Sequence, residues 1–279
     1  MTKALVFGGG GLTGIAWSIG LLAGLARDGV DLSETDLVVG TSAGSVVGAQ
    51  FANRVPLEEQ YDAQLAGGGS ERPASASRGT TLAMAGALVR SWRDPLAFRA
   101  RIGRIALAAD TIPEADRKAV IAARLTVPTW PSVRLRLAAV DALTGELVAF
   151  DRDSGVDLVD AVAASCAIPG IWPPSTAGGR RYVDGGIASG TNAQLAAGSG
   201  TVLIVAPSAI GGGPVPSARA EAEALRRGGS KVLVVAPDKA ARQASGRNPI
   251  DPAMRAPAAR GGRAQAASVA AAVREFWGA

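Results

Sequence analysis

Two side chains of this sequence, Ser42 and Asp184, are the candidates for a nucleophile and a base in an acyl-transfer reaction. Ser42 is the centre of Gly-Thr-Ser-Ala-Gly at residues 40–44, which matches the Gly-x-Ser-x-Gly pattern of a nucleophile elbow. Such an elbow is a sharp turn from a strand into a helix, and glycines such as Gly40 and Gly44 avoid the collision that a β-carbon would cause there. The alternative is an ordinary turn, because small residues are abundant in this chain.

The chain has no histidine, and this absence excludes several kinds of site. A Ser-His-Asp triad, a histidine-ligated zinc ion and a histidine general base are all impossible. The single cysteine, Cys166, excludes a disulfide framework and a cysteine-based metal cluster, and its small neighbours favour a buried thiol. A serine nucleophile must therefore give its proton to a carboxylate, a lysine or the N-terminal amine.

A second glycine-rich stretch follows the first predicted strand, residues 4–7, and opens a helix whose apolar residues recur at three- and four-residue steps. This glycine loop contains Gly8, Gly9, Gly10, Gly11 and Gly14. Free amides at a helix N-terminus favour an anion, so the amides of Gly9, Gly10 and Gly11 are candidates for an oxyanion hole. The loop also matches the dinucleotide pattern Gly-x-Gly-x-x-Gly, but the second predicted strand, residues 37–39, lacks the acidic residue that should end it.

Asp184 ends a short predicted strand, residues 181–183, and is followed by Gly185 and Gly186. With histidine absent, an aspartate is a plausible base. At its usual pKa of ~3.9, an aspartate is a poor base for a hydroxyl group, and partial desolvation would raise that pKa. The alternative is an Asp-Gly hairpin turn, but residues 187–200 are small and polar and do not resemble a partner strand.

Composition predicts a globular protein with a preference for anionic partners. The residues are 48% apolar and 19% charged, which is typical of a folded domain rather than a disordered chain. The net charge of +5 favours phospholipid surfaces or nucleic acid. The N-terminal residues lack the apolar segment of a signal peptide, and no apolar run approaches the ~20 residues of a membrane helix. We therefore expect a soluble, cytoplasmic protein.

Predicted strands and helices alternate along most of the chain. This order predicts an α/β protein, a three-layer α/β/α sandwich with a mostly parallel central sheet. In such a sheet, sites gather at the carboxyl ends of strands, and the glycine loop, Ser42 and Asp184 all follow predicted strands. We expect one domain, with a last helix that is interrupted at Gly261 and Gly262.

Taken together, these motifs resemble the patatin-like phospholipase family. The chain carries, in the family's order, the glycine loop at residues 9–14, Gly-Thr-Ser-Ala-Gly at 40–44 and Asp-Gly-Gly at 184–186. Residues 164–174 resemble the family's Ala-Ser-x-Ala-x-Pro block, and residues 141–145 resemble its Thr-Asp-x-x-Thr-Gly turn. The resemblance spans roughly residues 3–190.

The resemblance implies a lipid acyl hydrolase with a Ser-Asp dyad, which cleaves carboxylic esters of phospholipids or neutral lipids. Ser42 would be the acyl-enzyme nucleophile, Asp184 the general base and the glycine loop the oxyanion hole. No metal or organic cofactor and no nucleic acid is implied, and the oligomeric state stays open. One patatin-like domain would span residues 1–279, with a helical, lid-like insertion at about 67–127. The alternatives are a non-catalytic lipid-binding or scaffold protein on the same fold, or a nucleotide-binding protein.

The sequence departs from the family's pattern at two places. The family usually has Lys or Arg between the third and fourth glycines of its loop, where this chain has Thr13. The Asn-x-Pro that often follows Asp-Gly-Gly is reduced to Asn192 and Ala193. We interpret both departures as changes of substrate rather than a loss of activity.

Residues 88–109, with arginines around Trp92, would be either an interfacial helix in peripheral contact with a membrane or a lid helix whose arginines are solvated or paired.

Overall fold

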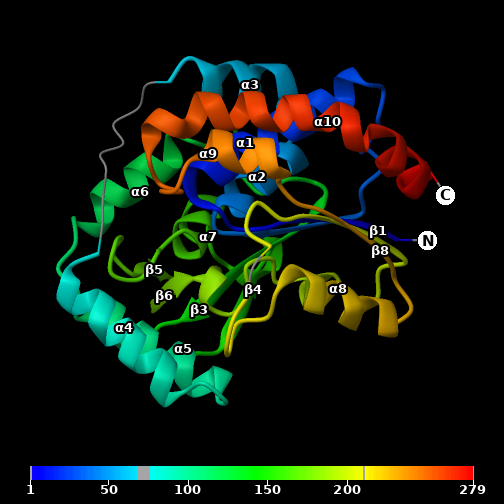
Figure 1. Cartoon of the computed structure of the whole chain (residues 1–279). Helices are drawn as coiled ribbons and strands as arrows, with labels where there is room; N and C mark the ends of the chain where they lie inside the picture. Colours follow the sequence, from blue (N-terminus) through cyan, green and yellow to red (C-terminus); the bar gives the residue numbers. More distant parts are fainter. Residues whose placement is uncertain (1, 68–75, 210, 279) are drawn as a thin grey trace.

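The computed structural model describes residues 2–67, 76–209 and 211–278, and within them one sheet of eight strands (Figure 1). The strands are β1 Lys3–Phe7, β2 Leu37–Thr41, β3 Arg134–Asp141, β4 Leu147–Phe150, β5 Ser175–Ala177, β6 Arg180–Asp184, β7 Thr201–Val205 and β8 Lys231–Val235. β3, β2, β1, β7 and β8 pair in parallel, whereas β4, β5 and β6 are antiparallel to their neighbours. The prediction of a mostly parallel sheet is confirmed.

Helices cover both faces of this sheet. They are α1 Gly11–Arg27, α2 Ala43–Ala52, α3 Leu57–Leu65, α4 Arg78–Arg90, α5 Pro95–Leu107, α6 Glu114–Ala122, α7 Leu158–Ser165, α8 Ala218–Arg227, α9 Lys239–Ser245 and α10 Arg255–Gly278. Figure 1 shows α1, α2, α3, α9 and α10 above the sheet, with α4, α5 and α8 below it. The protein therefore has the predicted three layers. None of the described helices is both long enough and apolar enough to cross a membrane.

The two faces of the sheet bury alternate residues of each central strand. In β1, Leu5 and Phe7 belong to the large core under α1, α2 and α10, whereas Ala4 and Val6 belong to a second core under α8. Successive side chains of a strand point to opposite faces, so a strand with helices on both sides must be apolar throughout. This is why the central strands read as continuous apolar runs.

The last helix is continuous, which corrects the expectation of an interruption at Gly261 and Gly262. α10 runs from Arg255 to Gly278 without a break. A β-carbon on Gly262 would lie 2.1 Å from the carbonyl oxygen of Trp17 in α1. This glycine therefore allows close packing of two helices, which offsets the roughly 0.5–1 kcal/mol that glycine costs inside a helix.

The segment predicted as a lid-like insertion, residues 67–127, is mainly helical where the structure describes it. It contains α4, α5 and α6, while its residues 68–75 lie outside the described part of the chain. The Asp94 carboxylate accepts a hydrogen bond from the amide of Ala97, and Pro95 takes the first position of α5. Pro95 thus marks the start of α5, after the turn that follows α4. The action of this segment as a lid stays a prediction.

Candidate active site

Ser42 lies in the sharp turn between β2 and α2, in a backbone conformation that is rare for a residue with a side chain. Its φ is 52° and its ψ is −119°. A β-carbon on Gly44 would lie 1.9 Å from the carbonyl oxygen of Phe7, and one on Gly40 would lie 2.7 Å from that of Gly44. The two glycines therefore let β1, β2 and α2 pack closely enough to hold this turn.

The register of β3 explains how Asp184 comes close to Ser42. Leu137 and Ala138 of β3 pair with both β2 and β4, so those two strands lie on opposite edges of β3. Ala139 pairs with both β4 and β6, so β6 lies on the same edge as β2. Thr41 pairs with Ala138 and Asp184 pairs with Ala139. The ends of β2 and β6 therefore meet at neighbouring residues of β3.

Asp184 is 4% exposed and only one of its carboxylate oxygens has a hydrogen-bond partner. Oδ1 accepts a hydrogen bond of 2.7 Å from the amide of Gly186, whereas Oδ2 has none of standard geometry among the described residues. Burial raises the pKa of Asp184 to about 6, against the opposing effects of the Ser42 hydroxyl, the Gly186 amide and the Arg117 charge. The carboxyl group is therefore ionised at neutral pH, yet more basic than an ordinary aspartate.

The backbone around Ser42 is fixed by side chains that sequence reasoning did not assign. The Ser42 amide donates to Oγ of Ser165 at 2.9 Å. The Ser42 carbonyl accepts from Oγ of Ser45 at 2.6 Å and from Sγ of Cys166 at 3.2 Å. Cys166 is buried, as predicted, and burial raises the pKa of its thiol. The sequence feature that could have identified Ser165 and Cys166 was their position in the Ala-Ser-x-Ala-x-Pro block.

The glycine loop lies beside Ser42, but its amides are not equivalent. The Gly8 amide donates to the carbonyl of Val205 at 2.9 Å, and the Gly9 amide donates to the carbonyl of Gly190 at 2.8 Å. The amides of Gly10 and Gly11 have no hydrogen-bond partner in the described ranges. α1 begins at Gly11, so these two amides lie at the positive end of its dipole.

A buried carboxylate, Glu221 of α8, holds the chain that follows Asp184. Its Oε2 accepts hydrogen bonds from the hydroxyls of Ser189, at 2.5 Å, and Thr191, and its Oε1 accepts from the Ala193 amide at 3.1 Å. Glu221 is 6% exposed, and burial raises its pKa. Sequence reasoning missed this residue. The feature that could have identified Glu221 was its place on the buried face of α8, which also carries Ala218, Ala222 and Leu225.

Asn192, in the segment that follows Asp184, connects this segment to the ends of β2 and β6. Its Nδ2 donates to the carbonyl of Gly185 at 3.1 Å and to Oγ1 of Thr41 at 3.1 Å. Gly185 packs so close to β3 that a β-carbon would lie 2.4 Å from the carbonyl oxygen of Ala138. The asparagine that the sequence retains without its proline therefore joins the ends of β2 and β6.

Ser42, Asp184 and the glycine loop line one cavity of about 600 Å³. Of the predicted site residues, Ser42, Asp184, Gly9, Gly10, Gly11, Gly14 and Gly186 line it, together with Thr13. Gly8, Gly40, Gly44 and Gly185 do not line it and act in packing instead. Residues of the segment 237–250, from α9 and the loop after it, also line the cavity, and sequence reasoning gave them no role. No group of three or more His, Cys, Asp or Glu side chains in the described residues could hold a metal ion.

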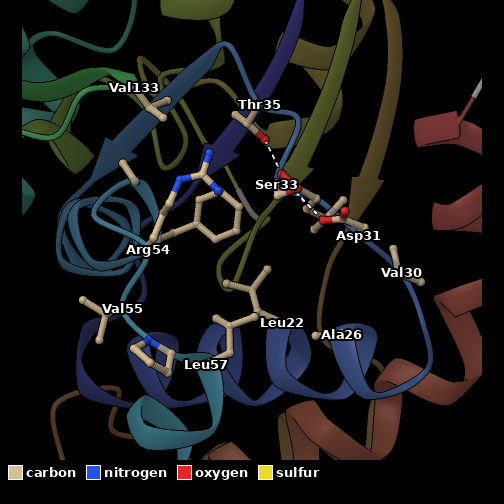
Figure 2. A pocket seen from close by; sticks show the side chains of 14 residues that line it. Leu22, Ala26, Val30, Asp31, Ser33, Thr35, Arg54, Val55, Leu57 and Val133 are labelled. Atoms are coloured by element: carbon tan, nitrogen blue, oxygen red, sulfur yellow. Dashed lines mark hydrogen bonds between the residues drawn. The ribbon is translucent and has the colours of Figure 1, made fainter.

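A second pocket lies at the amino end of β2, between α1, the start of α3 and the loop before β2 (Figure 2). Two of its polar side chains bond to their own loop. The Asp31 carboxylate accepts from the Ser33 amide at 2.8 Å, which lowers the pKa of Asp31, and the Thr35 hydroxyl donates to the Leu32 carbonyl at 2.7 Å. The pocket places a serine, Ser33, beside the Asp31 carboxylate, but both residues are exposed and the lowered pKa of Asp31 makes it a poorer base than Asp184. The cavity around Ser42 is therefore the candidate site.

Two solved structures are similar to the chain. The crystal structure of VipD from Legionella pneumophila is 14% identical with a TM-score of 0.48, over 97% of this chain and 67% of that one. The crystal structure of the type III effector protein ExoU is 16% identical with a TM-score of 0.43, over 98% of this chain and 53% of that one. The chain thus spans about half the length of ExoU.

The family comparison covers more than half of the chain. No curated protein sequence matches the chain. The model of the family described as Patatin-like phospholipase matches residues 5–197, a range that contains the glycine loop, Ser42 and Asp184. The chain therefore belongs to the patatin-like phospholipase family.

Proposed function

We propose that the protein is a lipid acyl hydrolase that cleaves carboxylic ester bonds of phospholipids or neutral lipids through an acyl-enzyme on Ser42. One observation carries this proposal. A serine in a strained turn and a buried carboxylate with an unpartnered oxygen, Asp184 Oδ2, line the same cavity. Family membership supplies the substrate class. The pair needs no histidine, and the chain has none.

In the proposed reaction, Asp184 accepts the proton of the Ser42 hydroxyl as Oγ attacks the ester carbonyl carbon. The tetrahedral intermediate collapses, and Asp184 returns the proton to the departing alcohol. Asp184 then takes a proton from a water molecule that attacks the acyl-enzyme, and Ser42 leaves with that proton as the fatty acid is released. A pKa of about 6 for Asp184 suits both directions of proton transfer near neutral pH.

The oxyanion of each intermediate would face the glycine loop. The unpartnered amides of Gly10 and Gly11, at the N-terminus of α1, support their assignment as the donors. The Gly9 amide is engaged with Gly190, so we assign Gly9 to hold the loop in place. Preorganised donors of this kind typically contribute about 3–4 kcal/mol each to transition-state stabilisation.

The helical insertion would present this site to a membrane, within a single domain that spans residues 1–279. Leu82 and Val89 of α4 are 73% and 77% exposed, and Trp92 after α4 is 55% exposed. The arginines around them, Arg90, Arg93, Arg101 and Arg104, are exposed too, and none forms an ion pair in the part of the chain that is described. An apolar surface with arginines suits an anionic lipid interface.

The helices that carry this surface pack beside the cavity. Ile187, which lines the cavity, packs against a buried cluster of Ala87 from α4 with Phe98 and Ile102 from α5. A β-carbon on Gly170, next to the cavity residue Pro169, would lie 2.4 Å from the Thr80 side chain of α4. A lipid that leaves the membrane beside α4 would therefore be near the cavity, which is the function expected of a lid-like insertion.

Hydrolysis of a lipid panel by matched variants tests the proposal. The native protein should release fatty acid from phospholipid, diacylglycerol or both. Ser42→Ala should lower this rate by at least about a thousandfold, because no acyl-enzyme can form. Ser208→Ala is the matched control, since Ser208 lines the same cavity and should be dispensable. Full activity of Ser42→Ala would contradict the proposal, and a folded native protein that binds lipid without hydrolysing any would favour the scaffold alternative.

A further inference from the structure

We infer that Arg242 and Arg247 form an anion-binding subsite at the rim of the cavity, which holds the phosphate group of a phospholipid substrate. This inference rests on the proposed function and narrows its substrate class. Both arginines line the cavity that contains Ser42 and Asp184, and both are exposed to solvent. They come from α9 and the loop after it, beyond residues 5–197 that the family model covers.

The position of Arg242 is fixed by its own helix. The Asp238 carboxylate accepts a hydrogen bond of 2.8 Å from the Ala241 amide and so caps α9 at its N-terminus. One guanidinium nitrogen of Arg242, Nη1, donates to the carbonyl of Pro237 at 2.7 Å. A guanidinium has five N–H donors, so most of them remain free for an anion.

The loop that carries Arg247 packs against the glycine loop. Two residues after Arg247, the carbonyl of Pro249 accepts a hydrogen bond of 3.0 Å from the Thr13 amide. A β-carbon on Gly11 would lie 2.5 Å from the same carbonyl oxygen, so the two loops are in close contact. The chain that carries Arg247 is therefore packed on the proposed oxyanion donors.

The charges of the cavity separate into a buried acid and an exposed basic rim. Asp184, Arg242 and Arg247 are the ionisable side chains that line it, and Asp184 is 4% exposed. The glycine loop contributes no charge, since Thr13 is its only polar side chain. Neither arginine forms an ion pair within the described residues. Guanidinium groups bind phosphate oxygens in a bidentate manner, so this rim suits the phosphate next to the scissile ester.

Kinetics on two matched lipids test the subsite without membrane effects. The substrates are dihexanoylphosphatidylcholine below its micelle concentration and dihexanoylglycerol, which has the same acyl chains and no phosphate. The variant Arg242→Gln/Arg247→Gln should raise KM for the phospholipid at least tenfold and change KM for dihexanoylglycerol less than twofold. Lys239→Gln, which removes an exposed charge from α9 outside the cavity, should change neither. An unchanged KM for the phospholipid, or an equal loss on both lipids, would overturn the inference.

Binding measurements separate this inference from the proposed reaction. Calorimetry with the Ser42→Ala protein should show tighter binding of dihexanoylphosphatidylcholine than of dihexanoylglycerol, and the double arginine variant should remove the difference. Arg-dependent binding without any hydrolysis by the native protein would leave the subsite standing and refute the reaction. Inorganic phosphate should bind at least tenfold more weakly than the phospholipid, because it lacks acyl chains. Equal affinity for inorganic phosphate would overturn the assignment to a lipid phosphate.

Discussion

The amide of Gly9 donates a 2.8 Å hydrogen bond to the carbonyl oxygen of Gly190, and this bond joins the glycine loop to the chain after Asp184. Gly190 lies between Ser189 and Thr191, whose hydroxyls both donate to the Glu221 carboxylate. One buried carboxylate from α8 therefore holds the segment to which the glycine loop is attached. The proposed oxyanion donors directly follow Gly9, so we expect their orientation to depend on Glu221.

Glu221→Gln should lower kcat about 10- to 100-fold with little change in KM. In the native protein, hydroxyl and N–H groups donate to the Glu221 carboxylate, whereas the NH₂ group of glutamine is itself a donor and cannot accept from them. Hydrogen bonds to charged groups contribute about 1.5–3 kcal/mol each. Urea unfolding should show a loss of about 1–3 kcal/mol in stability. The control is Glu223→Gln, on the same helix but exposed and paired with Arg226 at the surface. An unchanged kcat in Glu221→Gln would show that the loop holds its orientation without the carboxylate.

The pH dependence of kcat/KM should report the ionisation of Asp184. Burial raises its pKa to about 6, and the proposed base must be deprotonated to accept the Ser42 proton. We expect kcat/KM for a neutral ester to rise with pH through about 6 and to fall about tenfold per pH unit below it. The profile is measured between pH 4.5 and 8 at constant ionic strength. An inflection near pH 4 would show either that the pKa of Asp184 is not raised or that Asp184 is not the base.

Asp184→Asn should stabilise the fold at pH 8 while it removes activity. The native state binds the Asp184 proton more tightly than the unfolded state, because burial raises the folded pKa to about 6. The free energy of unfolding of the native protein should therefore fall as pH rises from about 4 to 6. Asparagine keeps an acceptor for the Gly186 amide without a buried charge, so the gain at pH 8 should be on the order of 1–3 kcal/mol. Denaturant unfolding should show little difference at pH 4, and a destabilised variant at pH 8 would contradict this account.

Vesicle co-sedimentation should show binding through α4 and the turn after it. The native protein should bind phosphatidylglycerol vesicles at low salt and bind less as salt increases. Arg90→Gln/Arg93→Gln should weaken this binding about 10- to 30-fold, because each arginine near an anionic surface contributes about 1 kcal/mol. Arg27→Gln/Arg260→Gln is the charge-matched control, since both residues are exposed on the helices that cover the other face. Equal loss in both double variants would indicate a general charge effect and no defined surface.

The features that the sequence predicts well are local ones. The turn at Ser42 follows from its flanking glycines, whose missing β-carbons leave room for β1 and β2. The parallel strands follow from apolar runs, because both faces of those strands are buried. The position of Pro95 predicts the boundary between α4 and α5, since proline suits the first turn of a helix.

Other features depend on contacts between distant segments. The sequence predicts Asp184 as the partner of Ser42, but it does not predict the antiparallel pairing of β6 with β3 that brings the two residues together. Glu221 is buried on a helix otherwise rich in alanine and charge, and its partners lie some thirty residues earlier. Gly262 permits close packing on α1, although glycine in a helix usually indicates a break. The sequence also gives no sign that residues 237–250 line the cavity, where the Pro249 carbonyl accepts a hydrogen bond from the Thr13 amide of the distant glycine loop.

Fluorophosphonate labelling with peptide mapping tests the central claim, that Ser42 is an activated nucleophile. We predict one adduct on the native protein, on Ser42, with labelling that slows at pH 5 as Asp184 becomes protonated. Ser208→Ala and Ser245→Ala, which change other serines of the same cavity, should label like the native protein. Ser42→Ala should not label at all. Undiminished labelling of Ser42→Ala, or an adduct on another residue of the native protein, would contradict the account.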